Sequence, residues 1–168
     1  MEQRKIVIRP ATKLDYPFIL RVNEENVEVL SPMDEQKLEY FSDCAEMLWV
    51  ALVDDVPAAF LIVLREGVNS YGSENYRWFS KNYERFLYID RIVIDEPFRR
   101  MGLGKKLYDE VFAHAKKTDV GSVTAEIDTI PYNEVSLGFH KAMGFNEVGV
   151  QVIRGGTIKV SLQEAKVK

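Results

Sequence analysis

The sequence predicts a mixed α/β fold, in which one central sheet carries helices on its faces. Strand-like and helix-like segments alternate along most of the 168 residues, and one strand runs through a glycine-containing turn into a helix. The chain then ends in a predicted hairpin around Gly155 and Gly156. Because no repeat or interdomain linker interrupts this pattern, we expect residues 1–168 to form a single domain with an insertion at about 66–85.

The individual elements follow from hydrophobic spacing and from turn residues. Pro32 ends the first predicted helix, Asp54 and Asp55 form the turn of a hairpin, and Gly144 caps the last helix. Residues 166–168 are expected to fray. The expected strands are 6–9, 46–53, 57–64, 86–94, 122–127, 145–152 and 157–162, and the expected helices are 13–30, 34–44, 102–117 and 133–143.

The insertion mixes polar turn residues with aromatic ones and has no clear period. A long loop in a compact domain is often a lid or a binding loop, but its aromatic side chains can equally pack on the domain. In the first case the aromatic side chains would form a pocket suited to a cation. These residues are Tyr71, Tyr76, Trp78 and Tyr83.

Composition and charge exclude several classes of function. The 22 basic and 26 acidic side chains give a net charge of −4, which argues against binding to nucleic acid or to an anionic membrane. A single cysteine, Cys44, allows no internal disulfide and fits a reducing, cytoplasmic setting. We also expect no signal peptide, no membrane span and, with two histidines and no ligand spacing, no metal site.

The turn between strand 86–94 and helix 102–117 carries the first chemical signal. No Ser, Thr, Asp or Asn immediately precedes Gly102 to cap the helix, and glycines let a ligand approach the backbone. Bare amides and basic side chains at a helix N-terminus suit a pyrophosphate, although a tight turn with solvated arginines would look similar. The residues concerned are Arg99, Arg100, Met101, Gly102, Leu103, Gly104 and Lys105.

Two motifs resemble the GNAT superfamily of N-acetyltransferases. The run Arg-Arg-Met-Gly-Leu-Gly at 99–104 resembles its Arg/Gln-x-x-Gly-x-Gly/Ala acetyl-CoA motif. Residues 133–145, Asn-Glu-Val-Ser-Leu-Gly-Phe-His-Lys-Ala-Met-Gly-Phe, resemble its second conserved block. The order of elements also matches the GNAT fold from Ile6 to Leu162.

The resemblance implies a fold with splayed central strands, at 86–94 and 122–127, and acetyl-CoA as the cofactor. The pantetheine arm would pair with the backbone of Ile92, Val93 and Ile94, and the pyrophosphate would lie on the amides of residues 100–105.

The second block places a polar stripe on one helix face, because residues three, four and seven apart lie together. Asn133 and Ser136 can bond the cofactor, although Asn133 can also be a simple helix cap. Phe139 is also expected to bind the cofactor, although its side chain lies on another side of this helix, which we expect to face the core. His140 falls where many GNAT enzymes carry a tyrosine that is thought to protonate the departing thiolate, and an imidazolium could do the same. The alternative is a histidine packed at a helix end.

Three acidic residues are candidates for the general base. Asp90 interrupts an apolar strand, and the family often places an acidic residue near this position; the alternative is an ion pair or a solvent-facing side chain. Glu126 and Asp128 are the alternates, and they share one face of strand 122–127 with Thr124. Their alternative is an ordinary polar sheet face.

The whole pattern predicts direct transfer of an acetyl group from acetyl-CoA to a primary amine in a ternary complex, with a small molecule as the acceptor. There are three alternatives. The chain could acetylate protein lysines or N-termini, it could be a non-catalytic acyl-CoA sensor, or it could use a different acyl donor. A homodimer through the C-terminal hairpin is a further possibility.

Overall fold

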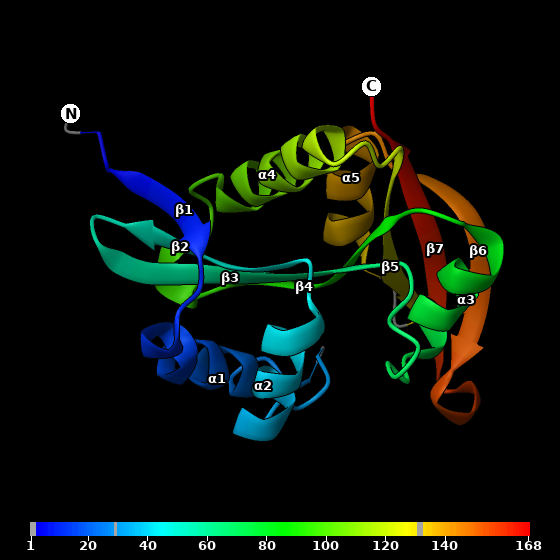
Figure 1. Ribbon diagram of the computed structural model, residues 1–168, viewed down its shortest axis with the longest axis horizontal. Helices are drawn as coiled ribbons and strands as arrows, with labels where there is room; N and C mark the ends of the chain where they lie inside the picture. Colours follow the sequence, from blue (N-terminus) through cyan, green and yellow to red (C-terminus); the bar gives the residue numbers. More distant parts are fainter. Residues whose placement is uncertain (1–2, 29, 131–132) are drawn as a thin grey trace. The chain divides into compact units, whose positions relative to one another are not determined.

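The strand β4 (Leu87–Ile94) is shared by the two compact units into which the chain divides in this computed structural model (Figure 1). The structure describes residues 3–28, 30–130 and 133–168. Unit 1 comprises 1–64 and 89–110, and unit 2 comprises 65–88 and 111–168.

The strands join in the order β1-β2-β3-β4-β5-β7-β6, which is the mixed sheet that the sequence predicts. The other strands are β1 (Ile6–Pro10), β2 (Met47–Val53), β3 (Val56–Arg65), β5 (Ser122–Ile130), β6 (Asn146–Ile153) and β7 (Ile158–Lys166). The helices are α1 (Tyr16–Glu24), α2 (Glu35–Cys44), α3 (Glu74–Asn82), α4 (Leu103–Lys117) and α5 (Glu134–Ala142). Short 3₁₀ helices lie at Lys13–Asp15, Glu96–Phe98 and Arg154–Gly156.

Unit 1 is built on the antiparallel strands β1, β2 and β3. The predicted turn between β2 and β3 is confirmed: Asp54 and Asp55 have positive φ angles of 50° and 69°, as a two-residue hairpin turn requires. Asp54 Oδ1 also accepts a hydrogen bond from the Lys5 amide at 2.9 Å. Figure 1 shows α1 and α2 on one side of these strands and the first half of α4 on the other. Ile19 and Phe41 from the helices are fully buried.

Unit 2 contains the parallel step of the sheet and a C-terminal hairpin. β4 pairs with β5 at Leu87↔Val123 and Tyr88↔Thr124, and β7 lies antiparallel between β5 and β6. The helix α5 ends as predicted at Gly144, whose φ is +95°. There the Phe145 amide donates to the His140 carbonyl at 3.0 Å, which is the bond of a Schellman cap that spans six residues.

The expectation of a loop over 66–85 was wrong, because this segment contains α3. Ser73 caps the helix by accepting a hydrogen bond from the Tyr76 amide at 3.2 Å. Asn75, Tyr76 and Phe79 are buried, so the alternative in which the aromatic residues pack on the domain is confirmed for the latter two.

Two further boundaries differ from expectation. The first helix is a 3₁₀ turn followed by α1, which ends at Glu24 rather than near residue 30. At the other end of the chain β7 runs to Lys166, and the Val167 amide donates to the Gly121 carbonyl at 2.9 Å. The predicted fraying at residue 166 was therefore wrong, since strand pairing holds this residue.

The contact between α3 and β6 yields a test of this packing. A Cβ at Gly149 would overlap the Trp78 ring, so Gly149→Ala must displace a bulky side chain. We expect it to lower the free energy of unfolding by about 1–3 kcal/mol, as overpacking does. Urea denaturation measures the loss, and Gly72→Ala is the control because its Cβ would meet nothing. An equal loss in a Trp78→Ala background would contradict the contact.

Candidate functional site

The turn before α4 has the backbone geometry of an open anion site. Arg100 and Gly102 have positive φ angles of 67° and 77°, so peptide groups on both sides of Met101 are rotated out of the regular pattern. This conformation strains arginine, and such strain gathers at functional sites. A Cβ added at Gly102 would meet no atom within 4 Å, so the described structure leaves this approach open.

The basic side chains of this turn are exposed, and the helix that follows begins at Leu103. Lys105 Nζ is 3.0 Å from Asp109 Oδ2, and Arg99 donates to Asn26 Oδ1 at 3.3 Å. Leu103 is buried, so only its backbone can face a ligand, and Met101 is half-buried. The arrangement therefore offers backbone amides and nearby positive charge to a phosphate group.

The three residues predicted to pair with pantetheine lie in the last part of β4, in unit 1. Val93 is buried, whereas Ile92 and Ile94 are half-buried.

Asp90 lies in a buried ion pair, which was the alternative interpretation of its sequence position. Arg91 Nε donates to Asp90 Oδ2 at 2.7 Å, and the two side chains are 3% and 4% exposed for Arg91 and Asp90. Arg91 also donates to Asn23 Oδ1 at 2.9 Å and to Ser31 Oγ at 2.9 Å. Its guanidinium lies 5.5 Å from the centre of the Phe41 ring. Asp90 thus balances a charge that fastens the segment after α1 to β4.

Glu126 has a partner that the sequence did not predict, the hydroxyl of Tyr88. The Tyr88 hydroxyl donates to Glu126 Oε1 at 2.9 Å, from β4 to β5 within unit 2. Tyr88 is itself fixed by edge-to-face contact with Tyr76 of α3, with ring centres 5.4 Å apart. The signal was present, because Tyr88 and Glu126 both lie near the start of the parallel ladder, but their register cannot be read from the sequence.

Asp128 lies two residues further along β5 and is half-buried. Burial raises its pKa above the usual range, and the charge of Arg154 opposes that rise. Thr124, the third member of this face, is buried and donates to the Leu87 carbonyl at 2.9 Å. The predicted face of β5 therefore divides into a structural hydroxyl and two carboxylates.

On α5 the structure brings the predicted polar stripe together. Asn133 caps the helix, accepting a hydrogen bond from the Ser136 amide at 3.1 Å, so its expected capping role is confirmed. His140 Nδ1 lies 2.7 Å from the Ser136 carbonyl, which can only accept, so Nδ1 carries the proton. Phe139 is half-buried, with its ring centre 5.6 Å from that of His140.

His140 is buried, with 7% of its surface exposed, and packs edge-to-face on Phe145. Burial lowers its pKa below the ordinary value, while the bond to the Ser136 carbonyl opposes the change. The neutral ring therefore dominates at neutral pH, and its Nε2 is an acceptor. The imidazolium expected from the sequence is therefore not the dominant form of His140 at neutral pH.

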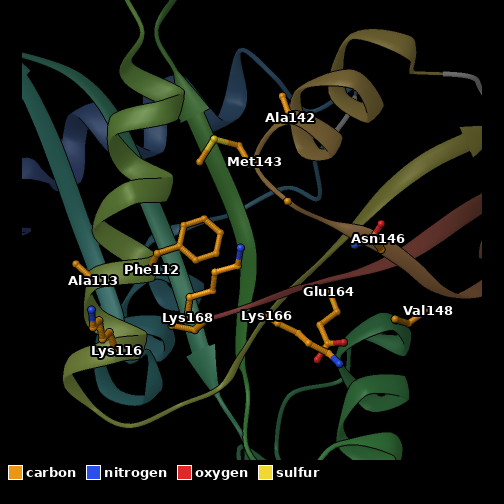
Figure 2. Close-up of a pocket in the computed structure, with 12 residues that line it drawn as sticks. Phe112, Ala113, Lys116, Ala142, Met143, Asn146, Val148, Glu164, Lys166 and Lys168 are labelled. Atoms are coloured by element: carbon orange, nitrogen blue, oxygen red, sulfur yellow. The ribbon is translucent and has the colours of Figure 1, made fainter.

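A cavity of about 940 Å³ lies elsewhere in unit 2, between the end of α4 and the C-terminal strands (Figure 2). Phe112, Met143 and Val148 give it an apolar lining, and Lys116 and Lys166 add charge. No residue predicted for the site lines it. Among the described residues there is also no cluster of metal-ligating side chains, and no described helix has the length and apolarity needed to cross a bilayer.

Known structures share this fold across nearly the whole chain. NAA60 of Arabidopsis thaliana in complex with acetyl-CoA is 17% identical, with a TM-score of 0.75 over 97% of this chain and 100% of that one. Ard1 of Thermoplasma volcanium is also 17% identical, with a TM-score of 0.76 over 97% and 98%. The ribosomal-protein-S18-alanine N-acetyltransferase of Escherichia coli is 15% identical, with a TM-score of 0.69 over 98% and 95%.

The search of curated proteins gave no match. The model of the acetyltransferase (GNAT) family, however, matches residues 15–145, which include β4, the turn before α4 and the whole of α5. That span is well over half of the chain. The chain therefore belongs to the GNAT acetyltransferase family.

Proposed function

We propose that this chain is an N-acetyltransferase that moves an acetyl group from acetyl-CoA to a primary amine by direct attack in a ternary complex. The exposed turn before α4 carries the proposal, since its rotated amides and open approach at Gly102 suit the diphosphate of the cofactor. Acetyl-CoA, when bound, supplies a thioester carbonyl that an amine can attack. The Arabidopsis neighbour with acetyl-CoA bound supports this cofactor.

Several residues are proposed to hold the cofactor. Backbone groups of 92–94 would pair with its arm, and amides of 99–105 would hold its phosphates. Asn133 and Ser136 would meet it from the start of α5, with Phe139 and His140 on the next turns. Asn133 keeps its side-chain nitrogen for this purpose, because the helix cap uses its oxygen.

Glu126 is the proposed general base. The attacking amine must be neutral, and its nitrogen loses one proton as the amide forms. We propose that a carboxylate takes this proton. The Tyr88 hydroxyl bonds one oxygen of Glu126, which fixes the orientation of the carboxylate. Asp128 is the alternate, since burial raises its pKa toward the working range. Asp90 remains a prediction, but its ion pair with Arg91 favours a positioning role.

His140 starts neutral in this scheme and accepts a proton at Nε2 before it can donate one. Its Nδ1–H is held by the Ser136 carbonyl, which fixes the tautomer. The single proton that the amine gives to Glu126 would pass through water to Nε2 of His140, which would then donate it to the departing thiolate.

We take the acceptor to be the amine of a small molecule. A protein substrate is the second candidate, because one structural neighbour is a ribosomal-protein-S18-alanine N-acetyltransferase. Thiol release from acetyl-CoA, measured with a panel of small amines and of peptides, separates the two. Thiol release with neither panel would favour the non-catalytic sensor.

Alanine substitutions at two glycines that both have a positive φ test cofactor binding. Gly102→Ala and Gly67→Ala each force a side chain into a positive φ, of 77° and 91°, and each should cost about 1–2 kcal/mol of stability. Only Gly102→Ala puts a methyl group on the proposed phosphate path, so it alone should raise the Kd for coenzyme A, by about 10-fold or more. Calorimetry measures both Kd values. Equal affinities in the two variants would place the cofactor elsewhere.

The base is tested by Glu126→Gln, which keeps shape and removes the carboxylate. We expect kcat to fall about 100-fold or more, as for loss of a general base. Asp128→Asn tests the alternate base on the same strand face in the same way. Asp90→Asn should instead lower thermal stability, because it leaves Arg91 buried without its counter-charge. Unchanged turnover in Glu126→Gln removes Glu126 from the mechanism.

His140 predicts a pH dependence of stability. Its pKa is lower in the folded chain than the value near 6.5 of an unfolded one, so unfolding takes up protons as the pH falls through about 6.5. The stability that neutral His140 contributes is present above that pH and is lost below it. Unfolding free energies between about pH 7 and 5 should fall less steeply in His140→Phe than in the wild type. His114→Gln is the control, and an unchanged slope in His140→Phe would contradict the shift.

A further variant of His140 separates stability from chemistry. A His140→Ala variant that folds and turns over amines at the wild-type rate would exclude His140 as a proton donor.

A further inference from the structure

Unit 2 contains a cavity that has no role in the proposed acetyl transfer. Its volume is about 940 Å³, and sites for small molecules typically measure about 300–1,000 Å³. The second half of α4, the end of α5, the strand β6 and the end of β7 with the residues after it surround the cavity, all within unit 2. The large or charged side chains of the lining include Phe112, Lys116, Met143, Val148, Lys166 and Lys168.

Three apolar side chains of this lining remain partly open to solvent. Phe112 and Met143 are half-buried, and Val148 is 38% exposed. The Phe112 ring packs on Phe145, which is buried and has its ring centre 6.1 Å away. Figure 2 shows Phe112 and Met143 extending toward the same opening, and a methionine side chain adapts its shape to what it contacts. An apolar ligand would therefore cover surface that folding leaves exposed.

Three lysines add positive charge to the same cavity. Lys116, Lys166 and Lys168 are exposed, and none of them has an ion-pair partner in the described part of the chain. Glu164 is the one carboxylate among the described lining residues, and it already accepts a hydrogen bond from Ser122 Oγ. Positive side chains therefore outnumber negative ones in this lining, although the whole chain has a net charge of −4.

The ends of two helices also meet the cavity, and a helix C-terminus by itself favours a cation. Lys116 lies in the last turn of α4 and offsets the partial charge of that end. Carbonyl groups of both last turns already accept backbone hydrogen bonds, from Val120 in α4 and from Phe145 in α5. Lys166 and Lys168 belong to no helix, so their charge remains available to a ligand.

We propose that this cavity binds a small amphipathic anion, of the class of medium-chain carboxylates. The aliphatic chain lies on Phe112, Met143 and Val148, and the carboxylate meets the ammonium groups of Lys166 and Lys168. The methylene groups of a lysine are apolar, so these side chains can cover the aliphatic chain while their charged ends meet the carboxylate. This site is independent of the proposed acetyl transfer, because no residue of the candidate site lines the cavity.

Calorimetry with two ligands of equal chain length and opposite charge tests the proposal. Sodium octanoate should bind the full chain at one site, and octylammonium chloride should bind about 10-fold or more weakly. Because the chain as a whole is acidic, non-specific attraction would favour the ammonium instead. Equal affinities for the two ligands, or no heat with octanoate below its micelle concentration, overturn the proposal.

Charge removal locates the bound carboxylate. Lys166→Gln combined with Lys168→Gln should raise the octanoate Kd by about 10-fold or more. Lys141→Gln is the matched control, since Lys141 is an exposed lysine of α5 that lies outside the lining, and it should leave the Kd unchanged. An unchanged Kd in the double variant, or an equal rise in the control, overturns the proposal.

Filling the cavity tests the position of the aliphatic chain. Ala113 lines the cavity from an exposed position on α4, so Ala113→Trp should reduce octanoate binding without disturbing buried packing. Coenzyme A at saturation should leave the octanoate Kd of the wild type unchanged. Full octanoate affinity in Ala113→Trp, or displacement of octanoate by coenzyme A, would place the ligand elsewhere and overturn the proposal.

Discussion

The candidate site depends on the backbone of the turn between β4 and α4. Arg100 and Gly102 hold positive φ angles of 67° and 77°, so the peptide groups around Met101 leave the regular pattern. The first amides of a helix have no partner within the helix, and in the proposed function the phosphates of the cofactor accept from them. In unit 2, Tyr88 both bonds Glu126 and packs on Tyr76 of α3, so a buried core residue orients a proposed site residue.

Most of the fold could be predicted because local signals agreed with the final structure. Asp54 and Asp55 tolerate positive φ, Gly144 suits a helix end, and the apolar strands are marked off by turn residues. The helix α3 was not predicted, because polar residues interrupt the aromatic ones along its nine positions. These polar residues include Asn75, Arg77, Ser80 and Lys81. Its stability comes from burying Tyr76 and Phe79 against the domain, a tertiary effect that a sequence period does not reveal.

The local backbone features of the candidate site could be predicted better than its side-chain contacts. The turn at 99–105 and the cap at Asn133 follow from residue types at fixed offsets. The ion pair of Asp90 was one of the alternatives, and the sequence did not decide among them, because neighbours in a strand point to opposite faces and Arg91 should then lie on the far side. Its long side chain instead returns to Asp90 at 2.7 Å, within a network that includes Asn23 and Ser31. Such a bond depends on what the buried guanidinium finds around it.

The contrast between the acidic residues of β4 and β5 shows how burial assigns roles. Asp90 and Arg91 lie out of water together, and removing either leaves a charge whose desolvation costs about 3–5 kcal/mol. Arg91 also bonds Asn23 and Ser31, so its pair with Asp90 fixes the segment after α1 to β4. Glu126 is bonded by the hydroxyl of Tyr88, a neutral group that orients the carboxylate. The contacts of Asp90 therefore favour a positioning role, and those of Glu126 favour the proposed catalytic one.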